Sequence, residues 1–196
     1  MKRATLVSLL ACALGACGTT PPSRFYALEP LPEAAHPGAD SGGLSVNVGP
    51  VVIAEGLDRA QMVTRLGPNQ LDLHEYDRWS EPLDENILRV LAENLSVVLG
   101  SQRIGMLPDS ETHETSWLVT VNVLTFEVGT DGNATLAARW RLYKPGELAP
   151  STTRKSVLVA PLPSKDGAGI AAAMSTNLAA LARDIAKVLQ GGAGSP

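Results

Sequence analysis

The stretch from Pro82 to Gly100, PLDENILRVLAENLSVVLG, decides how this chain folds, because it is the clearest helix in the sequence. Its apolar side chains recur every three or four residues, which places them on one helical face. Ser80 and Glu81 precede a proline at the start, and a glycine stands where a helix commonly ends. The face is formed by Leu83, Ile87, Val90, Leu91, Leu95 and Val98. Such a stripe has to be buried against a second layer of structure.

The residues before this helix predict strands. Apolar and polar residues alternate from Leu44 to Ile53, and Gly49-Pro50 within that stretch suggests a bulge or an edge position. Residues 61–66 and 70–75 flank the turn-type sequence Gly67-Pro68-Asn69 and predict a β-hairpin. The hairpin's candidate buried side chains are Met62, Leu71 and Leu73.

The residues after the helix predict three more strands and a second helix. The strand expected over 117–128 carries apolar side chains on both faces, which predicts a central strand that is covered on both sides. A turn at 130–133 leads to strands over 135–143 and 152–160. A helix over 167–190 should end at Gly191-Gly192. Its stripe is Ile170, Met174, Leu178, Leu181, Ile185 and Val188.

This order of elements predicts the fold class. We expect an α/β (α+β) two-layer sandwich, in which a mostly antiparallel sheet carries two long helices on one face. Residues 44–191 should form a single domain, and 192–196 a flexible tail.

The N-terminus predicts export and lipid attachment. Lys2 and Arg3 precede a short apolar stretch, which is typical of a signal peptide over residues 1–16. Leu14-Gly15-Ala16-Cys17 resembles the lipobox of bacterial lipoproteins, so Cys17 is the expected lipidation site. The alternatives are that Cys12 and Cys17 are only small apolar residues of an ordinary signal peptide, or that they form a disulfide. Two or more acyl chains on one cysteine would anchor the protein stably.

Residues 17–43 are rich in Pro, Ala, Gly and Ser, which is typical of a tether. The exception is an apolar island at 24–28, which predicts a short strand that docks on the domain. If it docks, Cys17 holds the domain close to its membrane.

Charge and motif content argue against several classes of function. The net charge is −4, and about −6 without residues 1–16, which gives no general attraction to nucleic acid or to anionic lipid headgroups. His36, His74 and His113 show no metal-ligand spacing, and no nucleophile motif occurs. The acidic residues between Asp72 and Glu85 lack the compact spacing of a calcium loop. We therefore expect no enzyme, no metal and no cofactor.

The segment Glu75-Tyr76-Asp77-Arg78-Trp79 has the composition of an interaction site. Tyrosine, tryptophan and arginine are the residue types enriched at interface hot spots. The alternative interpretation is structural: Tyr76 and Trp79 would cap the core where the hairpin meets the helix, and Asp77 would pair locally with Arg78.

Several motifs together resemble a known family. They are Ser23-Arg24-Phe25-Tyr26-Ala27-Leu28, Val48-Gly49-Pro50-Val51, Leu57-Asp58-Arg59, Met62-Val63-Thr64-Arg65, and Tyr76 to Leu83 running into Leu91-Ala92-Glu93-Asn94-Leu95. In this respect the chain is similar to the ABC-type transport auxiliary lipoproteins, whose members include the lipoproteins of the paraquat-inducible (Pqi) membrane-integrity systems. The C-terminal half matches that family only in the order of its elements.

The resemblance implies a periplasm-facing lipoprotein of the outer membrane, which works with a mammalian-cell-entry (MCE) type protein in moving lipids between membranes. Gly18 after the cysteine, in place of Asp, agrees with the enterobacterial rule for outer-membrane sorting. The candidate partner contacts are Leu57, Arg59, Tyr76, Arg78 and Trp79. Two rival functions stay open: a direct lipid-binding carrier, or an assembly or scaffolding lipoprotein of another envelope machine. A homo-oligomer would suit a tubular partner, but no motif encodes symmetry.

Overall fold

The computed structural model describes residues 21–32, 44–108 and 116–193. The expected signal peptide, Cys17, His36 and His113 lie outside these ranges. The described strands are β1 Arg24–Tyr26, β2 Val46–Ile53, β3 Gln61–Gly67, β4 Gln70–Trp79, β5 Ile104–Met106, β6 Trp117–Val128, β7 Asn133–Tyr143 and β8 Thr152–Pro161. The helices are a short 3-10 helix, Glu55–Leu57, and two α-helices, α2 Leu83–Leu99 and α3 Gly167–Ala193.

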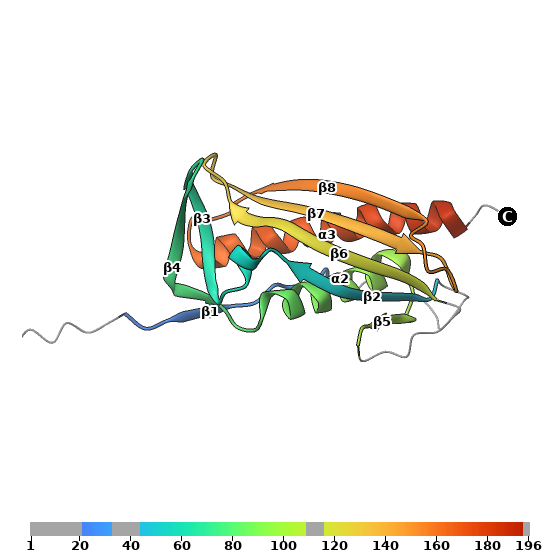
Figure 1. The fold of residues 1–196 in the computed structure, drawn as a ribbon. Helices are drawn as coiled ribbons and strands as arrows, with labels where there is room; N and C mark the ends of the chain where they lie inside the picture. The colour runs from blue at the N-terminus through green and yellow to red at the C-terminus, as the bar shows by residue number, and fades with distance from the viewer. Residues whose placement is uncertain (1–20, 33–43, 109–115, 194–196) are drawn as a thin grey trace, which may run out of the picture.

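The expected fold class is confirmed: one mixed but mostly antiparallel sheet carries α2 and α3 on one face (Figure 1). The two helices pack against each other and against β2, β7 and β8. The core lies between the layers and includes every residue of the two predicted helix stripes, with Val98 and Val188 only partly buried. On β7, Leu136, Ala138, Trp140 and Leu142 point into this core while Arg139 and Arg141 are exposed.

Glycine ends one of the two helices but not the other. Gly100 follows α2 in the left-handed conformation, with φ of 60°, and its N–H bonds the carbonyls of Ser96 and Val97. The expected stop at Gly191-Gly192 is wrong, because α3 continues through both glycines to Ala193. Glycine permits a helix end but does not impose one.

The sheet branches at β6, which is its longest strand. The first half of β6 pairs in parallel with β2, which pairs in parallel with β5, and its last residue, Val128, meets β3. β3 continues the second branch through β4 to β1, and β7 and β8 follow on the other side of β6. The parallel pairing of β2 with β5 arises because α2 carries the chain back across the sheet between β4 and β5.

Two predictions about burial need correction, and one about pairing is confirmed. Leu71 and Leu73 are 45% and 40% exposed, because the β3–β4 hairpin stands at one end of the molecule and has few contacts with either helix (Figure 1). β6 is central but covered on one face only, and a bulge at Leu124 leaves that side chain exposed while Phe126 turns into the core. The suspected bulge at Gly49-Pro50 is confirmed by the register shift between Val48 and Val51.

Candidate functional site

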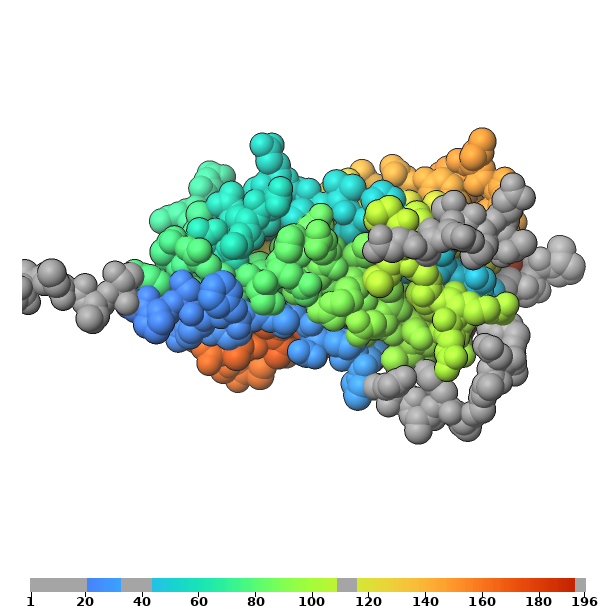
Figure 2. All heavy atoms as spheres, turned by 90° about the horizontal axis from the view of Figure 1, so that it is seen from below, coloured from blue at the N-terminus to red at the C-terminus, as the bar shows by residue number. Residues whose placement is uncertain are grey.

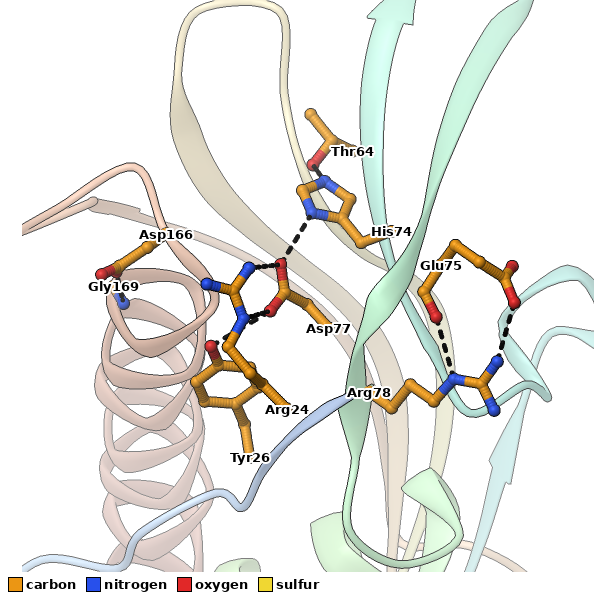
Figure 3. A network of polar contacts seen from close by, with 9 residues as sticks. All are labelled: Arg24, Tyr26, Thr64, His74, Glu75, Asp77, Arg78, Asp166 and Gly169. Atoms are coloured by element: carbon orange, nitrogen blue, oxygen red, sulfur yellow. Dashed lines mark hydrogen bonds and ion pairs between the residues drawn. The ribbon is translucent and has the colours of Figure 1, made fainter. Parts of the chain in front are cut away.

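The N-terminal strand β1 is held on the outer edge of β4 by one carboxylate, that of Asp77. β1 lies parallel to β4, with Arg24 opposite Asp77 and Tyr26 opposite Trp79. Arg24 donates from Nε and Nη2 to the two carboxylate oxygens, at 2.8 and 3.1 Å, and the Tyr26 hydroxyl donates to Oδ1 at 3.1 Å (Figure 3). Asp77 is almost fully buried, so these bonds replace the water that it has lost.

The electrostatics of this site favour the charged pair. The hydrogen bond to Asp77, more than its charge alone, raises the pKa of Arg24 above its ordinary value. Burial, followed by the hydrogen bond to Asp77, raises the pKa of the Tyr26 hydroxyl. His74 completes the group, with Nδ1 at 3.7 Å from Asp77 Oδ2 and Nε2 at 2.7 Å from the Thr64 hydroxyl. Tyr26 therefore stays a neutral donor, and Arg24 a cation, across the physiological range.

After β1 the chain crosses the helix layer. Seen from below, residues 21–32 form a strip that runs between α2 and α3 (Figure 2). Leu28 is buried between them, the Glu29 N–H donates to the Ser175 hydroxyl of α3 at 3.0 Å, and the Leu31 N–H donates to Asn94 Oδ1 of α2 at 2.6 Å. The segment is thus joined to both helices and to the sheet.

The start of α3 is shaped to receive this segment. A Cβ on Gly167 would lie 2.4 Å from Cε2 of Tyr26, so only glycine fits beside the ring. Asp166 caps the helix: its Oδ1 accepts from the Ser164 hydroxyl at 2.6 Å and from the Gly169 N–H at 2.9 Å. The first of these bonds, with help from the second, lowers the pKa of Asp166.

The five predicted contact residues separate into two groups. Trp79 and Leu57 are buried in the core, where the Trp79 ring lies 5.9 Å from that of Phe126. Tyr76, Arg78 and Arg59 reach the surface to different extents, with Tyr76 36% exposed. The expected local pair of Asp77 with Arg78 is wrong: Arg78 donates instead to the Glu75 carbonyl at 3.0 Å and to its carboxylate at 2.8 Å (Figure 3).

An irregularity in β4 brings Asp77 to Arg24. Gln61 pairs with Arg78, but the next residue of β3, Met62, pairs with His74. Glu75, Tyr76 and Asp77 are therefore out of register with β3, and Asp77 turns toward β1. Sequence reasoning missed the Arg24–Asp77 pair because 53 residues separate its members. The only signal was that an apolar island bearing an arginine was expected to dock as a strand.

The described residues contain neither a candidate metal site nor a helix that could span a membrane. No group of His, Cys, Asp and Glu among residues 21–32, 44–108 and 116–193 is arranged to hold a metal ion. The acidic residues around β4 serve other contacts, since Asp77 binds Arg24, Glu75 binds Arg78 and Glu81 binds Arg89. Neither α2 nor α3 has the length and apolar character needed to cross a bilayer.

The fold of this chain, a sheet with two helices on one face, is already seen in crystal structures. The fold matches a crystal structure described only as an uncharacterized protein, at a TM-score of 0.70 and 18% identity over 86% of this chain and 99% of that one. It also matches a protein from Xanthomonas campestris, at a TM-score of 0.68 and 17% identity over 87% of this chain and 97% of the other. None of the curated proteins compared with the chain matches it.

The family model of the ABC-type transport auxiliary lipoprotein component matches residues 26–186. The chain belongs to this family. The match begins within β1 and ends within α3, so it spans both branches of the sheet and both helices.

Proposed function

We propose that this protein is an outer-membrane-anchored, non-catalytic subunit of an MCE/ABC-type system that moves lipids between membranes and so maintains the envelope. The observation that carries the proposal is the family match over residues 26–186, because the family is that of an auxiliary component of ABC-type transport. A transporter protein is therefore the expected partner, and an MCE-domain protein is the particular partner proposed here.

The docked N-terminal segment supports a close attachment to the membrane. Arg24 stands seven positions after Cys17, and an extended chain spans at most about 3.5 Å per residue, so the tether reaches at most about 25 Å. Because Arg24, Tyr26 and Leu28 are fixed to the body, the lipid cannot pull this segment away without breaking those contacts. A lipidated Cys17 would hold the β1 end of the domain beside the bilayer.

The anchor is tested by replacing Cys17 with Ala or with Ser in the full chain. Wild-type protein should incorporate radiolabelled palmitate and separate with outer membranes on a sucrose gradient. Both variants should lose the label and leave the membrane fraction. Label retained by Cys17→Ala, or wild-type protein found with inner membranes, contradicts the proposed attachment.

The proposed partner surface consists of Arg59, Tyr76 and Arg78, the three predicted contact residues that the fold leaves accessible. Tyrosine and arginine are residue types enriched at interface hot spots, and Tyr76 lies in the part of β4 that is out of register with β3. Each guanidinium is also preorganised, since Arg59 donates to the Gly56 carbonyl at 2.8 Å and Arg78 to Glu75.

Pull-down of the MCE protein tests this surface. Tyr76→Ala combined with Arg59→Ala should reduce capture strongly while the melting temperature stays near that of wild type, because both side chains lie outside the core. Leu148→Ala is the matched control, since that leucine is fully exposed in the β7–β8 turn. Unchanged capture by the folded double variant overturns the assignment of the surface.

A direct lipid-binding carrier is the second candidate, and one feature favours it. A cleft of about 450 Å³ lies between residues 26–32 and α3, and its walls include Ala168, Ala171, Ala172 and Ala179. Native mass spectrometry of the full chain should find co-purified lipid if the protein is a carrier. An Ala172→Trp variant would fill the cleft and remove such a lipid, whereas an auxiliary subunit would lose nothing.

A further inference from the structure

A second hollow, far from β1, gathers positive charge. It lies where the end of β7 and the start of β8 meet the last turns of α3, at the end of the molecule opposite the N-terminal segment (Figure 1). Its volume is about 420 Å³, and its lining includes three basic residues, Lys144, Arg154 and Lys187. These side chains come from the β7–β8 turn, from β8 and from α3, so tertiary structure alone brings them together.

The three cations have no carboxylate partners within the part of the chain that the structure describes. Arg24, Arg65, Arg78 and Arg89 all form ion pairs, but Lys144, Arg154 and Lys187 form none. Two acids are close in sequence: Glu147, three residues after Lys144 in the same turn, and Asp184, three residues before Lys187. Asp184 accepts a hydrogen bond from Ser156, and neither acid forms an ion pair with the three cations. Unpaired cations also lie on the outer face of β7 and β8, and these three differ from them in lining one hollow.

The helix end explains only part of this charge. The C-terminus of α3 carries the negative end of the helix dipole, equivalent to about half an elementary charge. One lysine in the last turns suffices to balance it. The hollow keeps a surplus of about two positive charges after that balance.

The other walls suit a ligand that is anionic at one end and apolar at the other. Ser151 and Thr152 bring hydroxyl groups, and the Ser151 hydroxyl is already oriented by its bond to the Leu142 carbonyl at 3.1 Å. The indole of Trp117 forms an apolar wall, and a Cβ on Gly192 would lie only 3.3 Å from it, so the glycine keeps that side of the hollow open. Lysine, arginine and hydroxyl donors together are the groups that bind phosphate oxygens.

We propose that this hollow binds the phosphate group of a phosphomonoester or phosphodiester, held by Lys144, Arg154 and Lys187 and flanked by Trp117. Two sources carry that chemistry: the headgroup of a phospholipid, or a free phosphate compound. The site does not depend on the proposed MCE partner, because every residue in it belongs to this chain.

The test uses the full chain in a nonionic detergent at physiological salt, with inorganic phosphate and dihexanoylphosphatidylglycerol as separate probes in calorimetry. The site variant combines Lys144→Gln, Arg154→Gln and Lys187→Gln. The matched control combines Arg139→Gln, Arg141→Gln and Lys155→Gln, which removes the same charge from exposed, unpaired positions on the outer face of β7 and β8.

Wild type and control should bind one equivalent of at least one probe, and the site variant should bind it at least about tenfold more weakly. Binding of the lipid but not of inorganic phosphate identifies a headgroup as the source, and equal binding of both identifies free phosphate chemistry. The proposal is overturned if neither probe binds wild type, or if the control loses as much affinity as the site variant. These outcomes are independent of MCE capture, so they do not decide the proposed function.

Discussion

Replacing Leu28 by Ala tests whether the N-terminal segment is part of the folded core. Leu28 is 1% exposed between α2 and α3, and it is the one residue of 27–32 that is fully buried. Burial of a leucine side chain is worth about 1.5–3 kcal/mol, and the cavity left by its truncation adds to that loss. The variant should therefore lose about 2–5 kcal/mol of unfolding free energy. The loss should stay near the upper part of that range if the segment cannot shift, because Glu29 and Leu31 are fixed by Ser175 and Asn94.

Two measurements on the full chain distinguish loss of the segment from loss of the whole fold. Urea denaturation gives the global free energy, and limited trypsin digestion reports cleavage after Arg24, which requires β1 to leave β4. Leu148→Ala removes the same atoms from a fully exposed leucine and should change stability by less than about 0.5 kcal/mol. If Leu28→Ala unfolds at the same urea concentration as Leu148→Ala and resists trypsin equally, the segment is not held by the core and the short tether is wrong.

Three further predictions concern the same region. Asp77→Asn leaves Arg24 without a carboxylate and should accelerate tryptic cleavage after Arg24. Glu75→Gln, which removes only the carboxylate paired with the half-buried Arg78, should not, and equal rates would contradict the role of Asp77. Gly167→Ala should cost about 1–3 kcal/mol because its Cβ meets the Tyr26 ring, while Gly191→Ala, in open space, should be neutral or stabilising, and urea midpoints in the reverse order would refute this account. The pKa of Asp166 is lowered in the folded state, so its contribution is fully present above its ordinary pKa of 3.8 and is lost as the pH falls through the lower folded value. The stability difference between wild type and Asp166→Asn should therefore shrink below about pH 4 in acid denaturation, and a constant difference would refute the cap.

The two helices and the sheet could be predicted because their signals are local. The stripe of α2 and the capping Gly100 lie within one continuous stretch of sequence. Asp131 and Gly132, which are typical turn residues, indicate the β6–β7 turn. The branching of the sheet could not be predicted in this way. Whether β2 pairs with β6 in parallel depends on the path of α2 between them, which no single stretch of sequence records.

The candidate site was predicted in part, for the same reason. Tyr76 and Arg78 were singled out by residue type, which does not distinguish a surface tyrosine from a core tryptophan, so Trp79 and Leu57 entered the same set. Asp77 pairs with Arg24 only because β1 adds to the edge of β4. The basic hollow could not be predicted because Lys187 is distant in sequence from Lys144 and Arg154, and a negative net charge gives no sign of a local positive cluster.

Site-specific photo-cross-linking in intact cells tests the central proposal most directly. A benzophenone amino acid at position 76 lies on the proposed partner surface, and the same group at the exposed position 148 serves as the control. We predict that position 76 captures an MCE-domain protein in the wild-type envelope and that position 148 does not. Cross-links from position 76 only to unrelated envelope proteins, or equal capture of the MCE protein from both positions, would contradict the proposed role.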